Sequence, residues 1–159
     1  MASLRLEGSS VRLMPSASDD FERILALRLV ALRESLERLG RYDPVRARDR
    51  LAREFQPEHM RLIEVDGAFA GCVSLKPDGE DGLAIEHFYI DPAFQNLGLG
   101  GAVMGMLLAE ADAAGKPVRL GVLRRSDANR FYQRHGFTET HQEEFDIYYL
   151  RPVGGVSVA

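Results

Sequence analysis

One glycine-rich segment, QNLGLGG at residues 95–101, constrains this chain more than any other feature, because it separates an apolar run from a helical pattern. Glycine in regular structure costs roughly 0.5–1 kcal/mol relative to alanine, so its clustering here needs a reason. A turn that enters a helix presents unpaired backbone N–H groups and the positive end of the helix dipole, which favour an anion such as phosphate. Without Cβ atoms at Gly98, Gly100 and Gly101, a diphosphate can approach the backbone. We therefore interpret the segment as a phosphate-binding turn.

Neighbouring residues limit which phosphate ligand the turn suits. A Walker loop needs a lysine followed by a serine or threonine, and neither follows here, so ATP hydrolysis is disfavoured. A dinucleotide fingerprint needs a third glycine where Val103 stands. A structural alternative stays open, since Gly101 and Gly105 have the GxxxG spacing that allows close helix packing.

Hydrophobic periodicity and turn signals predict one continuous order of elements. One helix is expected from a capping box at Ser16 to Gly40, and a second from Asp43 to about Phe55. The predicted strands are residues 11–14, 60–65, 68–75, 83–90, 118–123, 137–141 and 145–150, and the later helices are residues 101–114 and 127–135. Hairpin strands pair antiparallel, whereas a strand-helix-strand unit requires parallel neighbours, so we expect a mixed sheet of about seven strands with four helices.

Length and composition limit the class of protein. At 159 residues, 45% of them apolar and 28% charged, we expect a single domain over residues 1–159. No membrane-spanning stretch or secretory apolar region is visible, so we expect no membrane partner and a cytoplasmic location. A net charge of −4 argues against a nucleic-acid partner. The single cysteine, Cys72, excludes an internal disulfide, and the four histidines lack metal-binding spacing, so no metal is expected.

Two motifs in order along the chain carry a resemblance to a known family. Residues 95–100, QNLGLG, have the form R/Q-x-x-G-x-G/A after a strand that ends in IDP, and this resembles the acetyl-coenzyme A loop of the GNAT superfamily of N-acetyltransferases. Residues 129–137, NRFYQRHGF, resemble that superfamily's next helix, which typically reads A-x-x-F-Y-x-x-x-G-F. Two such motifs separated by a strand are more specific than either one alone.

The resemblance implies a fold and an activity. It implies an α/β fold with a mixed, mostly antiparallel sheet and a V-shaped cleft between the fourth and fifth predicted strands, residues 83–90 and 118–123. The implied reaction is direct attack of a primary amine of a small molecule or peptide on acetyl-coenzyme A, through a tetrahedral intermediate and without a metal. A non-catalytic acyl-coenzyme A sensor or scaffold is the alternative, and a homodimer is plausible. The acceptor is open, although the acidic balance of the chain mildly favours a cationic amine.

The resemblance also implies roles for particular residues. Tyr132 matches the usual proton donor to the thiolate, and Glu86 is the candidate base, with His87 or no base at all as alternatives. Strict alternation along the strand places Glu86 on one face with Phe88 and on the other face from His87. Many relatives carry an asparagine where this chain has residues 125–127, RSD, so that contact passes to Ser126 or Asn129. The residues expected to bind the cosubstrate are Phe88, Tyr89, Ile90, Gln95, Asn96, Leu97, Gly98, Leu99, Gly100, Gly101, Ser126, Asn129 and Tyr132.

Overall fold

The computed structural model describes residues 2–155, which form eight β-strands and four α-helices joined by loops and short 3-10 turns. The strands are β1 (Ala2–Leu6), β2 (Ser9–Pro15), β3 (Met60–Val65), β4 (Ala68–Asp78), β5 (Gly82–Ile90), β6 (Val118–Leu123), β7 (Thr138–Gln142) and β8 (Asp146–Arg151). The helices are α1 (Phe21–Arg38), α2 (Pro44–Glu54), α3 (Leu99–Ala113) and α4 (Ala128–Arg134).

All the strands join one sheet in the order β1-β2-β3-β4-β5-β6-β8-β7. Each neighbouring pair is antiparallel except β5 and β6, which are parallel because α3 carries the chain back between them. The prediction of a mixed, mostly antiparallel sheet with four helices is therefore confirmed.

The sequence pattern missed strand β1, so the sheet has eight strands rather than about seven. β1 lies at the edge of the sheet and pairs antiparallel with β2, with Leu4 opposite Val11. The hairpin turn is made by Glu7 and Gly8, whose φ angles are 48° and 87°. An edge strand has one partner and a half-covered face, so its alternation of half-buried and exposed side chains leaves a weak signal in so short a segment.

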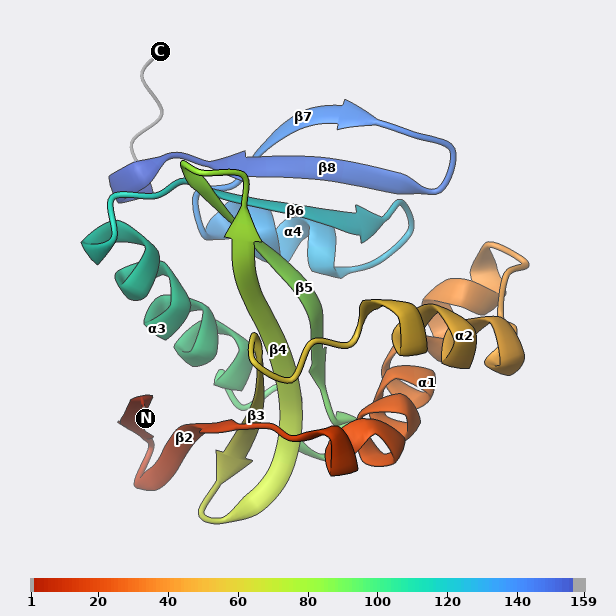
Figure 1. Ribbon diagram of the computed structural model, residues 1–159, viewed down its shortest axis with the longest axis horizontal. Coiled ribbons are helices and arrows are strands. Elements are labelled where there is room, and N and C mark those ends of the chain that lie inside the picture. Colours follow the sequence, from red (N-terminus) through yellow and green to blue (C-terminus); the bar gives the residue numbers. More distant parts are fainter. Residues whose placement is uncertain (1, 156–159) are drawn as a thin grey trace.

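The sheet separates two hydrophobic cores (Figure 1). Val103 of α3 and Tyr132 of α4 belong to one core, which covers one face of the strands. Ile24 of α1 and Leu51 of α2 belong to the other core, on the opposite face. Figure 1 accordingly shows α3 on one side of β4 and β5, and α1 and α2 on the other. Any site between the strands is thus bounded by a different helix pair on each face.

The capping box predicted at Ser16 is wrong. Ser16 Oγ donates instead to the carbonyl oxygens of Pro57 (3.1 Å) and Met60 (2.8 Å), while Asp20 Oδ2 accepts from the backbone N–H of Ala17 (2.8 Å). A 3-10 turn at Ser18–Asp20 precedes α1. The serine hydroxyl therefore ties the chain that enters α1 to the start of β3.

Strands β5 and β6 diverge, as predicted. They pair only through Leu83 with Val118 and Ala84 with Arg119, at their first residues. Beyond these pairs β6 continues along β8 as far as Leu123, while β5 continues along β4 as far as Ile90. The divergence leaves the inner backbone edges of both strands without a strand partner and opens a cleft between them.

Candidate active site

The glycine-rich turn leaves a row of backbone N–H groups without acceptors. Asn96 and Gly98 have φ angles of 65° and 77°, and α3 begins at Leu99. Within residues 2–155, the N–H groups of residues 96–101 donate to no carbonyl, whereas Gln95 N–H donates to Pro92 and Ala102 N–H donates to Gly98. A turn with left-handed residues that leads into a helix N-terminus presents its free N–H groups to an anion.

The glycines of this turn serve packing as well as access. A Cβ at Gly100 would lie 3.4 Å from the Phe131 ring, and one at Gly101 would lie 3.7 Å from the His135 ring, so both residues face α4. A Cβ at Gly105 would meet nothing within 4 Å. The packing alternative thus holds for the approach of α4 to α3, but not through the GxxxG pair as such.

The side chain of Gln95 fixes this turn to the sheet. Gln95 Nε2 donates to the carbonyl oxygen of Ile90, the last residue of β5, at 3.0 Å. Asp91 N–H in turn donates to the carbonyl of Ala70 in β4. The row of free amides is therefore held at the end of the strand that forms one wall of the cleft.

A β-bulge in β5 overturns the predicted alternation. Cys72 lies opposite Tyr89 and Ser74 lies opposite Glu86, so two residues of β5 face one residue of β4. His87, with φ of 49°, is one of the two. The extra residue places Glu86 and His87 on the same side of the sheet, with ligand atoms within 4.8 Å of each other, whereas Phe88 packs into the α3 core.

A glycine on β4 makes this bulge possible. A Cβ at Gly71 would collide with the carbonyl oxygen of Tyr89. A glycine inside a strand often marks close backbone approach, so Gly71 was a usable signal in the sequence for an irregularity in the neighbouring strand.

The cleft lies between β5 and β6 and has a volume of ≈ 340 Å³. Helices on both faces contribute to its walls. The lining residues are Arg28, Leu32, Leu36, Arg50, Glu54, Ile85, Glu86, His87, Phe88, Tyr89, Leu120, Gly121, Val122, Leu123, Ser126, Ala128, Tyr132, Asp146 and Tyr148. Most candidate site residues from the strands and from α4 are thus brought together, whereas the glycine turn lies outside this cavity.

Tyr132 lies in this wall with 8% of its surface exposed. Its ring contacts those of Phe131, Phe137 and Tyr149, at centroid distances of 5.3, 5.8 and 6.4 Å. Burial raises the pKa of the phenol. The hydroxyl is therefore protonated throughout the physiological range and is available as a donor inside the cleft.

Ser126 and Asn129, at the start of α4, make different hydrogen bonds. Asn129 Nδ2 donates to the carbonyl oxygens of Leu123 (3.1 Å) and Ser126 (2.8 Å), and its Oδ1 accepts from the Tyr149 hydroxyl (2.8 Å). This amide therefore holds the loop between β6 and α4 against β8. Ser126 Oγ accepts from the N–H of Ala128 (3.1 Å) and lines the cleft, with its own O–H still free to donate.

Arg28, His87 and Tyr89 form a hydrogen-bonded group in the α1 side of the cleft. Arg28 Nη1 donates to the Tyr89 hydroxyl (2.7 Å) and lies 3.1 Å from His87 Nδ1, which is also 3.0 Å from that hydroxyl. A guanidinium has only donors, so Nδ1 must be the acceptor and the ring proton is assigned to Nε2. The lone pair of His87 is already occupied, which makes this residue a poor base.

Two carboxylates complete this side of the cleft. Glu54 Oε2 lies 3.3 Å from His87 Nε2, and Glu54 Oε1 accepts from Arg50 Nε at 2.8 Å. These contacts with His87 and Arg50 hold the pKa of Glu54 at about 2. Glu86 Oε1 lies 3.1 Å from Lys76 Nζ, and its side chain is 36% exposed. Glu54, Glu86 and His87 offer ligand atoms within 4.8 Å of one another, but each carboxylate is already balanced by a cation.

Sequence reasoning missed Arg28, Arg50, Glu54 and Asp146. Arg28 left a signal, since it is a charged residue inside the apolar stripe of α1 and only 7% exposed. The other three come from distant parts of the chain and carry no local pattern. Burial raises the pKa of the Asp146 carboxyl, the largest effect on that group.

Gly121 is a further position that the sequence did not single out. A Cβ there would lie 2.8 Å from Cε1 of Tyr148, so only glycine allows this ring to lie across β6. The Tyr148 ring also stacks on His141, at 4.6 Å and 6°. The Tyr148 ring, which lines the cleft, is therefore in contact with both β6 and β7.

Comparisons with known proteins agree with this architecture. The family described as Acetyltransferase (GNAT) family matches residues 23–137. The structure of PaiA N-acetyltransferase from Thermoplasma acidophilum in complex with coenzyme A superposes with a TM-score of 0.68 at 13% identity, over 89% of this chain and 98% of that chain. A GNAT-family acetyltransferase from Listeria monocytogenes 4b F2365 gives 0.67 at 16% identity, over 95% and 99%. Ard1 from Thermoplasma volcanium gives 0.68 at 23% identity, over 91% and 97%.

The search of curated proteins found no significant match. Within the described part of the chain, no helix combines the length and apolar character that crossing a bilayer requires. Because their sequence identities are below 25%, the solved structures show only the fold, whereas the family match shows family membership.

Proposed function

The chain belongs to the GNAT acetyltransferase family, and from that premise we propose that it transfers an acetyl group from acetyl-coenzyme A to a primary amine of a small molecule or peptide. The observation that carries the proposal is the row of unpartnered backbone N–H groups at residues 96–101, held at the end of β5 beside the cleft. Such a row is complementary to a diphosphate, and the neighbouring cleft contains a buried phenol.

In this proposal the main chain binds the cosubstrate. The amides from Asn96 to Gly101 bind the pyrophosphate, and the unpaired edge of β5 at residues 88–90 holds the pantetheine arm as an added strand would. One of these N–H groups also stabilises the oxyanion of the tetrahedral intermediate. Ser126 contributes a hydroxyl donor, while Asn129 keeps the loop in shape.

Tyr132 is the proposed proton donor to the departing thiolate. A phenol of pKa near 10 transfers a proton to a thiolate whose acid has a pKa near 8.5 slightly uphill in water. Burial raises the pKa of Tyr132. The same desolvation raises the pKa of a thiol in that cleft, so the difference between the two acids, which sets the driving force, changes less than either value.

Glu86 is the proposed base, acting on the ammonium group of the acceptor directly or through water. It is preferred over His87 because the only lone pair of that imidazole accepts from Arg28 and Tyr89. The ion pair of Glu86 with Lys76 leaves a second carboxylate oxygen free. An acceptor that binds as the neutral amine needs no proton removed before it attacks, so its rate depends less on Glu86.

The test is acetyl-coenzyme A consumption with a panel of amino acids, peptides, polyamines and amino sugars, with mass spectrometry of the product. The expected outcome is an acetamide that forms only with enzyme and scales with its concentration. Binding of coenzyme A, followed by thermal shift, is measured in parallel; a ligand at 100 times its Kd adds about 2.7 kcal/mol to stability. Stabilisation by coenzyme A without any acetylated product would favour the non-catalytic binding module.

A further inference from the structure

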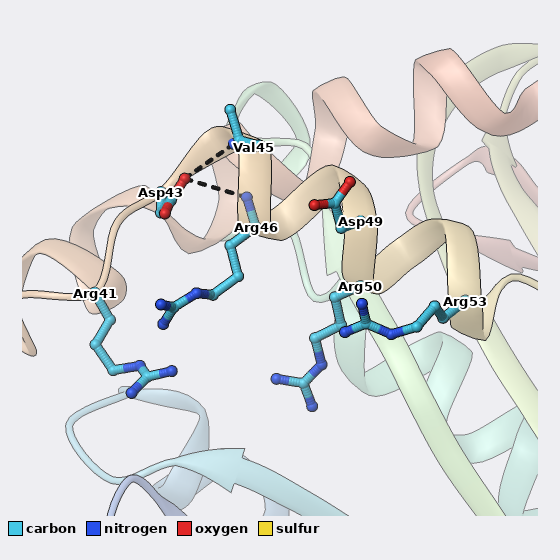
Figure 2. A pocket seen from close by; sticks show the side chains of 7 residues that line it. All are labelled: Arg41, Asp43, Val45, Arg46, Asp49, Arg50 and Arg53. Atoms are coloured by element: carbon cyan, nitrogen blue, oxygen red, sulfur yellow. Dashed lines mark hydrogen bonds between the residues drawn. The ribbon is translucent and has the colours of Figure 1, made fainter.

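An arginine-lined hollow lies beside the cleft, along one side of α2 (Figure 2). Its volume is ≈ 560 Å³, and it is lined by Arg41, Asp43, Val45, Arg46, Asp49, Arg50 and Arg53. Figure 2 shows the guanidinium groups of Arg41, Arg46 and Arg50 extending into the same space. We call this surface the arginine hollow.

The arginine hollow is positively charged in a chain whose net charge is −4. Its four arginines face two aspartates, and Asp43 is used as the cap of α2, where Oδ1 accepts from the N–H groups of Val45 and Arg46 at 3.1 Å each. Within residues 2–155, the side chains of Arg46 and Arg53 have no carboxylate partner. The positive charge of the hollow is therefore not neutralised by its own lining.

This arrangement is unfavourable for α2 by itself. Arg46 and Arg50 are four residues apart, a spacing at which like charges destabilise a helix. Arg48, by contrast, points elsewhere and forms a bidentate pair with Glu22, at 2.8 Å for each contact. The arginines of α2 thus divide into one that is paired with α1 and a group that gathers around the hollow.

The hollow and the cleft are adjacent. Arg50 lines both, and Glu54, its partner at 2.8 Å, lines the cleft. Arg41 lies with its Cζ 4.0 Å from the ring centroid of Phe145, next to Asp146 of the cleft wall. The hollow therefore lies next to the part of the cleft that α1 and α2 line, with Arg50 between the two.

A further cation lies inside the cleft. Arg28 is 7% exposed, and its hydrogen-bond partners are the neutral groups His87 Nδ1 and the Tyr89 hydroxyl. Among the described residues no carboxylate is within ion-pair distance of Arg28, and its Nε has no hydrogen-bond partner. A buried charge is normally compensated by an opposite one. Arg28 thus adds an uncompensated cation on the α1 side of the cleft, in a cavity that carboxylates also line.

We propose that the acceptor amine carries an anionic group, a carboxylate or a phosphate, that binds in the arginine hollow while its amine lies at Glu86. This inference rests on the proposed acetyl transfer and names the class of its acceptor. Arginine presents a planar fork of donors that matches the oxygens of both anions. The local charge reverses the expectation of a cationic amine, which came from the charge of the whole chain.

Matched acceptors test this assignment. The C-terminally amidated peptides Ala-Asp-amide and Ala-Asn-amide differ only in one carboxylate, and phosphoethanolamine and ethanolamine form a phosphate pair, so the two arms separate the anion types. The variant is the double substitution Arg46→Gln and Arg53→Gln, and the control is Arg48→Gln on the same helix, away from the hollow. We expect the anionic member of at least one pair to exceed its neutral partner in kcat/KM by about tenfold or more.

The double variant is expected to raise KM for the preferred anionic acceptor about tenfold while leaving kcat and the neutral acceptor unchanged. Added salt should raise KM in the native enzyme and less so in the double variant, because exposed charges are screened. Arg48→Gln should match the native enzyme. Equal rates within both pairs, a preference for spermidine, or an unchanged KM in the double variant would each overturn the inference while leaving acetyl transfer intact.

A binding measurement keeps the test independent of turnover. Citrate is titrated by calorimetry into protein saturated with coenzyme A, so that the turn at residues 96–101 is already occupied. We expect binding to the native protein and to Arg48→Gln, and about tenfold weaker binding to the double variant. Absence of citrate binding, or tight binding of a DNA duplex instead, contradicts a small anionic acceptor. Failure to acetylate any amine would refute the proposed function itself, and only the citrate arm would then report on the hollow.

Discussion

The two faces of the cleft are built from different parts of the chain. On the α3 and α4 side, just outside the cavity, the proposed ligand-binding groups are consecutive main-chain amides at residues 96–101. On the α1 and α2 face, they are side chains such as Arg28 of α1 and Arg50 and Glu54 of α2, which meet β5 only in the folded protein. The proposed cosubstrate site therefore comes from one short segment of the sequence, whereas the α1 and α2 face combines side chains from elements that are distant in the sequence.

This difference teaches where substrate choice is encoded. A main-chain site depends on backbone shape, so it needs glycine at a few positions and tolerates changes elsewhere. A side-chain site can be changed by single substitutions without disturbing the turn that holds the cosubstrate. A protein of this kind can thus keep one cosubstrate while its acceptor changes.

The largest expected effect tests whether the proton donor lies on the α3 and α4 side of the cleft. Tyr132→Phe should lower kcat by on the order of 10²–10³-fold, because a positioned acid contributes in that range. The affinity for coenzyme A should not change, since the phenol is buried rather than part of the turn. Stopped-assay kinetics and calorimetry measure the two quantities.

Tyr149→Phe is the matched control for that change. It also removes a buried hydroxyl, one that donates to Asn129 Oδ1 at 2.8 Å, and its ring contacts Tyr132. We expect a loss of about 1 kcal/mol in stability and little change in rate. Equal rate losses in both variants would mean that packing, and not proton donation, explains the effect of Tyr132.

The next effect tests the α1 and α2 face, where Glu86 is the proposed base. Glu86→Gln should lower the rate near pH 7 by about thirtyfold, below the 10² typical of a positioned base, because some acceptor arrives already neutral. The deficit should shrink as the pH rises toward the pKa of the acceptor amine, which is about 8 for a peptide N-terminus and about 10 for an alkylamine. His87→Asn, which keeps a residue that tolerates positive φ, should instead reduce stability by removing one of the two acceptors of Arg28 Nη1. A larger rate loss for His87→Asn would reassign the base.

The features that could be predicted from the sequence are divided in the same way, into those that depend on neighbouring residues and those that depend on distant ones. The turn, the order of helices and strands from residue 60 onward and the parallel pair around α3 were predictable, because each depends on neighbouring residues. The bulge that brings Glu86 and His87 together was not, since it depends on the register between β4 and β5. The contacts of Arg28 could not be predicted either, because it lies within the leucine-rich stripe of α1 and its neutral partners are about 60 residues away in the sequence.

A smaller effect probes the main-chain face directly. Gly98→Ala should weaken coenzyme A binding about tenfold, since a non-glycine residue at φ of 77° costs roughly 1–2 kcal/mol and shifts the turn. Gly105→Ala is the control, because a Cβ there meets nothing within 4 Å, and it should stabilise α3 by up to about 1 kcal/mol. Unchanged affinity in Gly98→Ala would remove the turn from the proposed binding site.

The smallest effect concerns the anchoring of the main-chain face at the far end of α3. Asp112 accepts from Arg151 Nη1 and Nη2, at 2.8 and 3.1 Å, and from Gly154 N–H at 2.9 Å. These bonds, chiefly those from Arg151, lower the pKa of Asp112 from 3.8 to about 2. A depressed folded-state pKa means that the stabilisation is complete above pH 3.8 and is lost as the pH falls toward 2.

Asp112→Asn should therefore cost about 1–2 kcal/mol at neutral pH, a modest value because solvent reaches the carboxylate, and lower Tm by a few degrees. The native protein and the variant should converge in stability as the pH approaches 2, which urea titrations at several pH values measure. Glu110→Gln, which breaks an exposed pair with Arg61 on the same helix, should cost less. Turnover at neutral pH should be unaffected in both variants, since neither residue lines the cleft. A fall in turnover with Asp112→Asn would show that the anchoring of α3 reaches the turn, and that the two faces are not independent.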